Sequence, residues 1–279
     1  GIPGVLNGEN RNSGALDVNI RGMQGQGRSP VVIDGALQES TVYRGYAGMA
    51  GRTYVDPDFI GGVSIEKGPS AAADGTGAIG GIVRARTLNA GDIIAPGGTW
   101  GVVVRGGLSG NSASPPEAAT IGGSEPAVRN YNRPDPFDLR GKNGSVTAAY
   151  HSEMIDVIVG RAERDNGNYF AGESGLDPSS WKGGAHPFTY GEQVTNTSMD
   201  NTSHLLRTVL RPNENHTLDL SYMRYESLFG EMKPSQLMWA DTAYQTTSEV
   251  EVDTYTARYR YKPENSLIDL RADLWATNV

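Results

Sequence analysis

Tyrosine and arginine side chains are concentrated in one glycine-rich segment near the N-terminus, between residues 38 and 54. Aromatic rings stack on flat ligands, and the planar guanidinium group of arginine binds carboxylates through two parallel hydrogen bonds. Glycines in the same segment let rings and backbone approach such a ligand closely. We therefore predict a loop that captures a planar anionic ligand such as haem or an iron chelate, with the candidate contacts Tyr43, Arg44, Tyr46, Arg52 and Tyr54. The alternative is that these tyrosines only pack against a surrounding wall.

The histidine and aspartate residues of the chain form no catalytic or metal-binding pattern. The 4 histidines are scattered without an H-E-x-x-H motif, and the chain has no cysteine, so we predict neither a metal site nor thiol chemistry. Asp56 and Asp58 flank Pro57, which indicates a helix that begins at the proline with Asp56 as its cap, rather than a hydrolase pair. The sequence predicts no enzyme and no resident cofactor.

Charge and hydropathy narrow the class of protein further. The formal net charge is −8 and no run of basic residues occurs, which argues against nucleic acid, because its binding relies on clustered cations. Apolar runs are only a few residues long, so no transmembrane helix is predicted. A mean hydropathy of −0.43 remains compatible with a membrane β-barrel, whose strands alternate between lipid-facing and lumen-facing residues.

The chain divides into two regions with different patterns. Residues 1–97 contain short apolar runs between glycines, which predict a small mixed α/β unit. Residues 98–279 contain long alternating segments. In the last of them, Ile268, Leu270 and Leu274 share one face of a strand, and we expect this face to contact lipid. Strands of the first region are expected near 18–20, 31–33, 63–65 and 79–83.

The connections of the second region alternate in length. We predict seven strands near 99–109, 144–152, 155–164, 201–211, 216–227, 250–261 and 267–279. Long polar connections at 110–143, 165–200 and 228–249 alternate with tight turns at 152–154, 212–215 and 262–266. Outer-membrane barrels have this asymmetry, with short periplasmic turns and long extracellular loops. Because lipid does not tolerate open sheet edges, we expect these strands to form part of a larger barrel.

The first region resembles the plug domain of TonB-dependent receptors. The resemblance is carried, in order, by Ile2-Pro3-Gly4-Val5, Val18-Asn19-Ile20-Arg21-Gly22-Met23, Val32-Ile33-Asp34-Gly35, Val63-Ser64-Ile65-Glu66-Lys67-Gly68-Pro69-Ser70 and Gly75-Thr76-Gly77-Ala78-Ile79-Gly80-Gly81. It covers about 90 residues. A looser likeness to the haem and haemophore receptor branch runs from Tyr43-Arg44-Gly45-Tyr46 to Thr87-Leu88-Asn89-Ala90.

This resemblance implies a mainly β fold: a plug at 1–97, followed at 98–279 by the N-terminal portion of an outer-membrane barrel of about 22 strands. It implies uptake of an iron compound, energised by TonB from the inner membrane, with outer-membrane lipid around the barrel. It also implies that Arg21 and Lys67 face carboxylates of the barrel wall and lock the plug. Lys67 stands where arginine is usual, so its half of the lock is expected to be weaker.

The identity of the ligand stays open between haem and a ferric siderophore. The plug contains no histidine, whereas haem receptors of this family can hold iron through a plug histidine. Either a tyrosine replaces it, a loop histidine such as His186 serves, or the ligand is not haem. Two alternative functions use the same scaffold: a receptor or sensor that binds a protein partner such as a haemophore, and a passive porin, against which the plug motifs argue.

Overall fold

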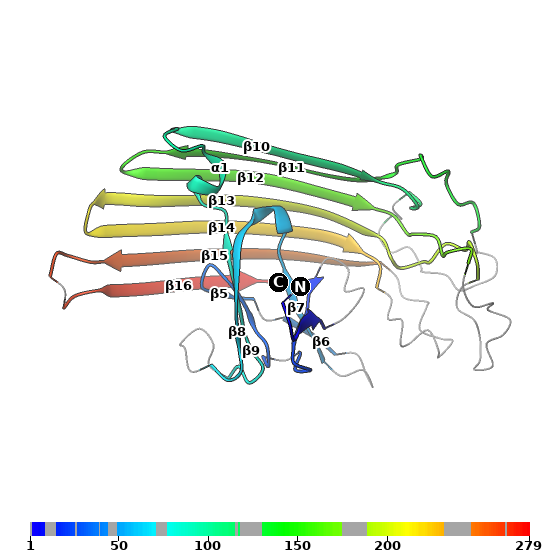
Figure 1. Ribbon diagram of the computed structural model, residues 1–279, viewed down its shortest axis with the longest axis horizontal. Coiled ribbons are helices and arrows are strands. Elements are labelled where there is room, and N and C mark those ends of the chain that lie inside the picture. Colours follow the sequence, from blue (N-terminus) through cyan, green and yellow to red (C-terminus); the bar gives the residue numbers. More distant parts are fainter. Residues whose placement is uncertain are drawn as a thin grey trace.

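The computed structural model describes residues 2–8, 15–25, 27–38, 40–43, 49–70, 77–114, 117, 130–174, 189–231, 247–265 and 267–279. Its backbone is divided between one large sheet and a smaller unit that lies against one face of that sheet (Figure 1). We call the sheet the wall and the smaller unit the plug.

The wall consists of seven antiparallel strands, each paired with its neighbours in sequence. Their bounds are β10 (Trp100–Ser109), β11 (Gly141–His151), β12 (Ile155–Asn166), β13 (Met199–Asn213), β14 (His216–Phe229), β15 (Ser248–Tyr261) and β16 (Leu270–Asn278). Lengths of 9 to 15 residues suit tilted strands that cross a hydrocarbon layer, which takes about 9–11 residues. The seven predicted strands are confirmed, with ends that differ by at most three residues.

Alternation along the strands gives the wall two chemically different faces. On β12, Ile158 and Ala162 are each 1% exposed beneath the plug, whereas Val159 on the other face is 52% exposed. Leu270 and Leu274 of β16 lie on this outer face, as predicted. Ile268 lies in the connection before β16, where its amide closes a turn to the carbonyl of Asn265, so it is not part of the strand.

Connections of different length leave the wall at its two ends (Figure 1). At one end, β11–β12, β13–β14 and β15–β16 are joined by turns of three, two and eight residues. β10, β12 and β14 end, and β11, β13 and β15 begin, at the opposite end, which we call the long-loop end because the longer connections join the strands there. This alternation confirms the prediction from sequence, and it follows from the up-and-down order of the strands.

The plug is built from three small sheets. The first pairs β1 (Val5–Asn7) with β3 (Val18–Ile20), and the second has the order β2 (Ala15–Leu16), β7 (Met49–Tyr54), β6 (Ser40–Tyr43). The third has the order β5 (Ala36–Leu37), β4 (Val31–Ile33), β9 (Gly81–Thr87), β8 (Ile60–Lys67), with β4 and β9 parallel. Their buried core contains Val18, Ile20, Val31, Ile33 and Val83.

Strand β9 begins two residues after the predicted start at Ile79. Gly81 opens it with φ +137°, and an added Cβ would lie 2.2 Å from the carbonyl oxygen of Glu66. Only glycine combines this backbone conformation with so close an approach of β8. The pairing with β8 therefore starts at Gly81 and continues to the pair between Ile60 and Thr87.

Two single helical turns of the N-terminal region pack against the wall. Asp56 caps the 3₁₀ turn η2 (Pro57–Phe59) by accepting a 2.8 Å hydrogen bond from the amide of Asp58, which confirms the predicted start at the proline. The turn α1 (Ala90–Ile93) follows β9. Side chains from both turns enter one apolar cluster with wall residues, whose buried members are Phe59, Ala90, Ala149, Ile158, Ala162 and Leu205.

Among the described residues, no helix is long and apolar enough to cross a membrane.

Candidate functional site

The inner face of the wall holds the plug through arginine side chains, and Arg207 of β13 is the most buried of them. Its guanidinium forms a fork with Asp219 of β14, with Nε–Oδ1 and Nη2–Oδ2 distances of 3.0 and 2.8 Å. Its Nη1 atom donates across to the plug, to the carbonyls of Thr87 and Leu88 at 3.3 Å each. A charged side chain that is 6% exposed requires such partners, because an unpaired buried charge is costly.

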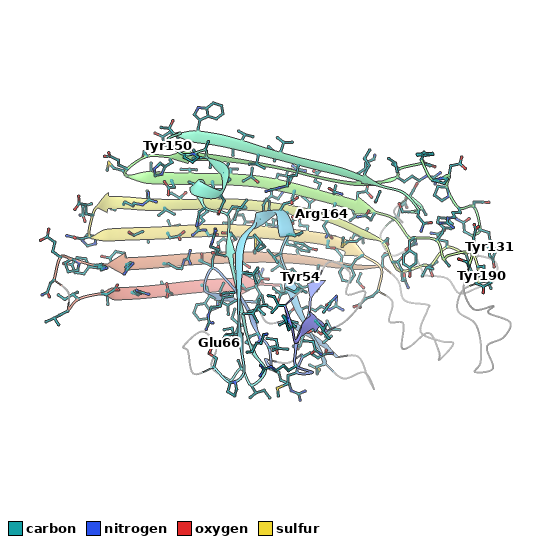
Figure 2. All side chains as sticks on the ribbon, in the orientation of Figure 1. Tyr54, Glu66, Tyr131, Tyr150, Arg164 and Tyr190 are labelled. Atoms are coloured by element: carbon teal, nitrogen blue, oxygen red, sulfur yellow. The ribbon has the colours of Figure 1, made fainter. Side chains whose placement is uncertain are left out.

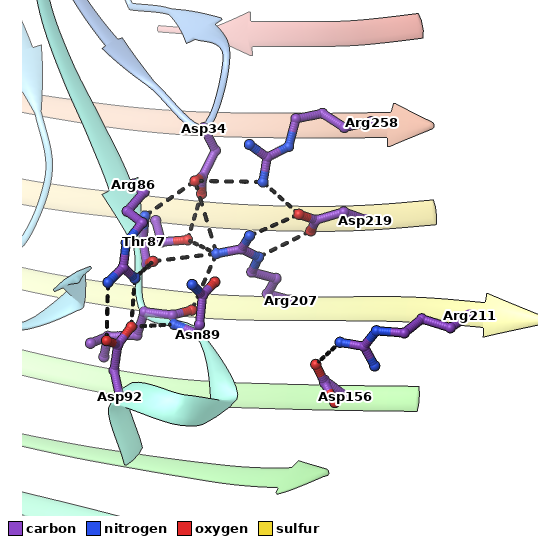
Figure 3. A network of polar contacts seen from close by, with 11 residues as sticks. Asp34, Arg86, Thr87, Asn89, Asp92, Asp156, Arg207, Arg211, Asp219 and Arg258 are labelled. Atoms are coloured by element: carbon purple, nitrogen blue, oxygen red, sulfur yellow. Dashed lines mark hydrogen bonds and ion pairs between the residues drawn. The ribbon is translucent and has the colours of Figure 1, made fainter. Parts of the chain in front are cut away.

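Asp34 is the plug carboxylate at the centre of this network (Figure 3). It lies at φ +50° in the turn between β4 and β5 and accepts hydrogen bonds from the hydroxyl and the amide of Thr87, at 2.5 and 3.2 Å. Arg207 and Arg258 approach it to 3.9 and 3.7 Å. Arg258 of β15 also binds Asp219 at 2.5 Å. Two wall arginines and two carboxylates thus form a cluster that joins β4, β9 and three wall strands, with Arg207 and Asp34 buried and Arg258 and Asp219 half-buried.

A second arginine anchor lies at η2. Arg164 of β12 binds Asp56 through Nε at 2.8 Å and Nη2 at 3.0 Å, and its Nη2 also binds Asp58 at 2.9 Å. Asp56 therefore caps the helical turn and binds the wall at the same time. Phe59 follows directly and packs over Gly160 of β12, where an added Cβ would lie 2.7 Å from the ring.

The helical turn α1 is fastened within the plug by Arg86 and Asp92, in a pair with hydrogen bonds of 2.5 and 3.0 Å. The hydrogen bonds from Arg86 lower the pKa of the Asp92 carboxyl below its ordinary value, and the same contact raises the pKa of Arg86. Asp92 also accepts the amide hydrogen bond of Asn89 at 2.8 Å. This pair holds α1 where it contacts β11 and β12 of the wall.

At Asp56 and Asp34 the polarity is opposite to that of the predicted lock, because the wall supplies the arginines and the plug supplies the carboxylates. Arg52 of the plug and Glu231 beyond the end of β14 form an ion pair with the predicted polarity. Lys67 donates to the carbonyl of Pro3 at 2.6 Å, and Arg21 is an exposed residue at φ +52° whose amide binds the carbonyl of Gly4 at 2.8 Å. Within the described residues, no ion pair joins either side chain to the wall. The lock through Arg21 and Lys67 stays a prediction for wall strands other than these seven.

Two of the predicted ligand contacts lie in packed surroundings. Arg52 pairs with Glu231 beyond the end of β14 and lies over the ring of Phe229, 5.7 Å from its centroid. Tyr54 packs against Tyr225 with 5.6 Å between ring centroids, where Figure 2 places it close to the wall. Arg52 is 3% and Tyr54 4% exposed. Both side chains contact the wall, and their contact with a ligand stays a prediction.

The remaining candidates lie outside what the structure describes. Arg44, Tyr46 and His186 are outside the described residues, and only the backbone of Tyr43 is described, as the last residue of β6. Their role in ligand capture stays a prediction. In the described part of the chain, no group of three His, Cys, Asp or Glu side chains converges as a metal site.

Several residues of the anchors were not singled out in the sequence. Arg164, Arg207, Asp219 and Arg258 occupy positions of the inner face, and Asp34 belongs to the quoted segment Val32-Ile33-Asp34-Gly35. The available signal was the alternation of residues along each strand, because charged residues that alternate with apolar ones on a membrane strand usually face the lumen. The alternation gives the face of each residue, but it does not indicate which plug residue is its partner.

A meander of membrane-length strands, with an N-terminal unit bound to its inner face, defines a plugged β-barrel, of which this chain forms one part. The chain belongs to the TonB-dependent receptors of the bacterial outer membrane: residues 1–82 match the family "TonB-dependent Receptor Plug Domain". It is therefore part of a receptor and not of an enzyme.

The relatives agree with this membership. A hemophilin receptor of Acinetobacter baumannii is 35% identical across the whole chain, which spans 30% of the length of that protein. The heme transporter BhuA of Brucella suis is 35% identical over 104 residues, which are 35% of this chain and 15% of that protein.

Solved structures show the same fold. The Serratia marcescens hemophore receptor HasR, in complex with its hemophore HasA and heme, has a TM-score of 0.70 at 23% identity over 99% of this chain and 34% of that chain. The FrpB iron transporter of Neisseria meningitidis has a TM-score of 0.67 at 18% identity, over 98% of this chain and 35% of that chain. The described chain therefore spans about a third of the length of these receptors.

Proposed function

We propose that this chain is the plug and first wall portion of a receptor that imports an iron compound, haem first among the candidates, with energy delivered by TonB. The observation that carries the proposal is a folded plug bound to the inner face of a membrane wall by the arginines Arg164, Arg207 and Arg258. A plug held in this way closes the lumen, so passage requires that it move. Relatives named as a hemophilin receptor and as heme transporters support haem as the ligand.

The anchors suggest which part of the plug stays in place during transport. η2, β9 and α1 are bound to the wall through Arg164, Arg207 and the apolar cluster around Phe59. By contrast, β1 is held by a three-residue pairing with β3. Force applied through the N-terminal side would therefore disrupt β1 before the anchored region, because only a few hydrogen bonds resist it. We place the short-turn end of the wall in the periplasm and the long-loop end outside the cell.

The second candidate is capture of a protein partner that delivers the ligand. HasR was solved with a hemophore, and one relative, from Acinetobacter baumannii, is a hemophilin receptor. The long-loop end could contact such a partner: Tyr131 and Tyr190 lie there (Figure 2), and Tyr131 forms a 2.9 Å hydrogen bond with Thr189. One receptor could perform both transport and protein capture. The two candidates differ in whether the receptor binds free haem or binds haem only when a carrier protein delivers it.

The ligand is tested by titrating the purified full-length receptor with haem and with ferric siderophores. Haem bound with a shifted Soret absorbance supports the haem assignment, and loss of that shift in Tyr43→Ala or Tyr46→Ala would assign the iron ligand to a tyrosinate. Siderophore binding that is weakened mainly by Arg44→Ala would favour a chelate. Tyr150→Ala, at the short-turn end of the wall, is the control and should leave binding unchanged.

Unchanged affinity in all three loop variants would remove Tyr43, Arg44 and Tyr46 from the site and assign binding to the long connections of the wall, including His186. Binding of neither haem nor any ferric siderophore would refute the proposed function. A complex that forms only with haem-loaded carrier protein would establish the second candidate.

A further inference from the structure

We infer that Arg52 of the plug is a positioning residue for ligand capture, which holds the long-loop side of the plug to the wall and does not touch the ligand itself. The inference rests on the proposed uptake function. It concerns three wall residues, Phe229, Gly230 and Glu231, which we call the loop root because they lead from β14 into the long connection to β15.

Strand β7, which contains Arg52, lies against the long-loop half of the wall. Tyr54 at its end packs on Tyr225, with 5.6 Å between ring centroids, and both belong to a buried cluster with Val252. Tyr225 lies in the last part of β14 and Val252 in the first part of β15. Gln38 donates to Thr254 of β15 at 2.8 Å. The segment 38–54 is therefore attached to two wall strands close to the ends that meet a long connection.

Arg52 supplies the charged part of this attachment. Its guanidinium forms an ion pair with Glu231 and lies over the ring of Phe229, 5.7 Å from the centroid. The ring attracts the cation in addition to the carboxylate. The side chain of Arg52 is 2% exposed and that of Glu231 16%. Wall strands beyond these seven can only bury the pair further, so a ligand would have to displace Glu231 to reach Arg52.

The partner of Arg52 is itself fastened to a second long connection. The amide of Gly230 donates to the carbonyl of Ser198 at 3.0 Å, and a Cβ added to Gly230 would lie 2.4 Å from the Cα atom of Asn196. Only glycine permits so close an approach. Asn196 and Ser198 end the connection between β12 and β13, and each is 4% exposed. Arg52 is thus joined through the loop root to two long connections of the wall.

This chain of contacts fixes the plug and two long connections relative to one another. A ligand captured between the plug and the long connections meets a site whose parts come from segments far apart in the sequence. When such parts move independently, the competent arrangement is populated only part of the time, and the apparent affinity falls by that fraction. Arg52 therefore raises the affinity by pre-organising the site.

A positioning role and a direct contact make opposite predictions for Glu231. If Arg52 bound a carboxylate of the ligand, Glu231 would compete with it, and removal of the Glu231 charge would leave the affinity unchanged or raise it. If Arg52 acts through Glu231, removal of either partner opens the same attachment and the two losses are equal. The double variant then loses no more than either single variant, because both changes affect one interaction.

The test uses the full-length receptor with haem as the probe and compares Arg52→Met, Glu231→Gln and the double variant. Each should weaken haem binding about tenfold, as expected when the competent arrangement is populated about a tenth of the time. In energised cells, the half-saturating haem concentration should rise by the same factor while the maximal uptake rate is retained.

Hydrogen exchange of the purified receptor reports on the attachment separately from the ligand. The Tyr54 amide, which binds Oε1 of Gln38 at 3.2 Å, should exchange about tenfold faster in all three variants. The Leu88 amide, which binds the carbonyl of Phe59 in the region anchored by Arg207, should change by less than about twofold. This pattern shows that the rest of the plug stays docked.

Two further variants control for charge and for folding. Arg140→Met removes a cation from the same end of the wall, where Arg140 pairs with Asp138 at 2.6 Å and is 42% exposed, and haem binding should stay at the wild-type value because an exposed pair contributes little. Arg52→Lys retains the charge and should recover most of the affinity, even if Arg52→Met fails to reach the membrane.

Weaker binding in Arg52→Met with unchanged or tighter binding in Glu231→Gln would overturn the inference and establish a direct ligand contact. Unchanged binding in both, losses that add in the double variant, or a lower maximal rate at an unchanged half-saturating concentration would also overturn it. If the wild-type receptor binds no haem, the proposed haem ligand fails instead. Exchange at Tyr54 still tests the attachment in that case, so the two failures are distinguishable.

Discussion

Replacing Arg207 with methionine should loosen the plug at β9 and α1. Methionine retains much of the side-chain volume but removes the charge, the fork to Asp219 and the hydrogen bonds to the carbonyls of Thr87 and Leu88. Asp34 would then lose one of its two cationic neighbours inside the protein. Removal of one partner from a buried ion pair costs about 3–5 kcal/mol.

The structure indicates that the loss of stability in Arg207→Met lies near the lower limit of this range. Arg258 remains 2.5 Å from Asp219 and 3.7 Å from Asp34, so neither carboxylate is left without a cation. We expect a loss of about 3 kcal/mol, which corresponds to an increase of about 100-fold in local opening. Local opening is measured by hydrogen exchange, here at the amides of Leu88 and Ile94, which bond to the carbonyls of Phe59 and Ala90.

The measurement needs the purified full-length receptor in detergent, at a pH where exchange reports equilibrium opening. Arg161→Met is the matched control, because Arg161 lies on the outer face of β12, is 57% exposed and pairs only with Glu163 among the described residues. The control should change exchange at Leu88 and Ile94 by less than about twofold, as expected for an exposed pair. Equal protection in Arg207→Met and the wild type would refute the view that this arginine anchors the plug.

Three further changes probe the same attachment. Asp34→Asn should raise exchange in β9 about tenfold, less than Arg207→Met, because the amide oxygen still accepts one of the two hydrogen bonds that Thr87 donates to Asp34; unchanged exchange would exclude Asp34 as an anchor. Phe59→Ala should destabilise the packing of η2 on the wall by about 3–5 kcal/mol, seen as faster proteolysis near η2, whereas a wild-type rate would show that the ring contributes little. Arg86 lowers the pKa of Asp92, so the ionised carboxylate stabilises α1 fully above its ordinary pKa of 3.8, and this stabilisation is lost as the pH falls through the lowered pKa. Protection of the α1 amides against hydrogen exchange should therefore stay constant between roughly pH 5 and 8. A decline in protection within that range would contradict this reasoning.

The wall could be predicted from the sequence because its signals are local. Alternation placed Leu270 and Leu274 on the outer face, and the Pro-Asn-Glu-Asn turn at 212–215 fixed the hairpin between β13 and β14. Each hairpin brings neighbouring segments together, so the order of the strands follows from the order of the chain. Ile268 was assigned to the outer face of a strand that begins two residues later, because alternation alone does not show where pairing starts.

The anchors could not be predicted in the same way, because they join segments more than 100 residues apart. The contact between Asp56 and Arg164, for example, depends on how η2 docks on β12. At Asp56 the sequence indicated a helix cap, which is correct, but it gave no sign of the second role. At Arg52 and Tyr54 the residue types suited a ligand, yet side chains that stack on ligands also pack well against a wall.

The central claim is that this chain is part of an energised uptake receptor for an iron compound. The most direct measurement is uptake of iron-labelled haem by cells that carry the full-length receptor, with and without a functional TonB system. We predict surface binding in both strains and internalisation only in the strain with TonB. Internalisation at the same rate in both strains would contradict the account, because a plug held by buried anchors would then not need energy to admit the ligand.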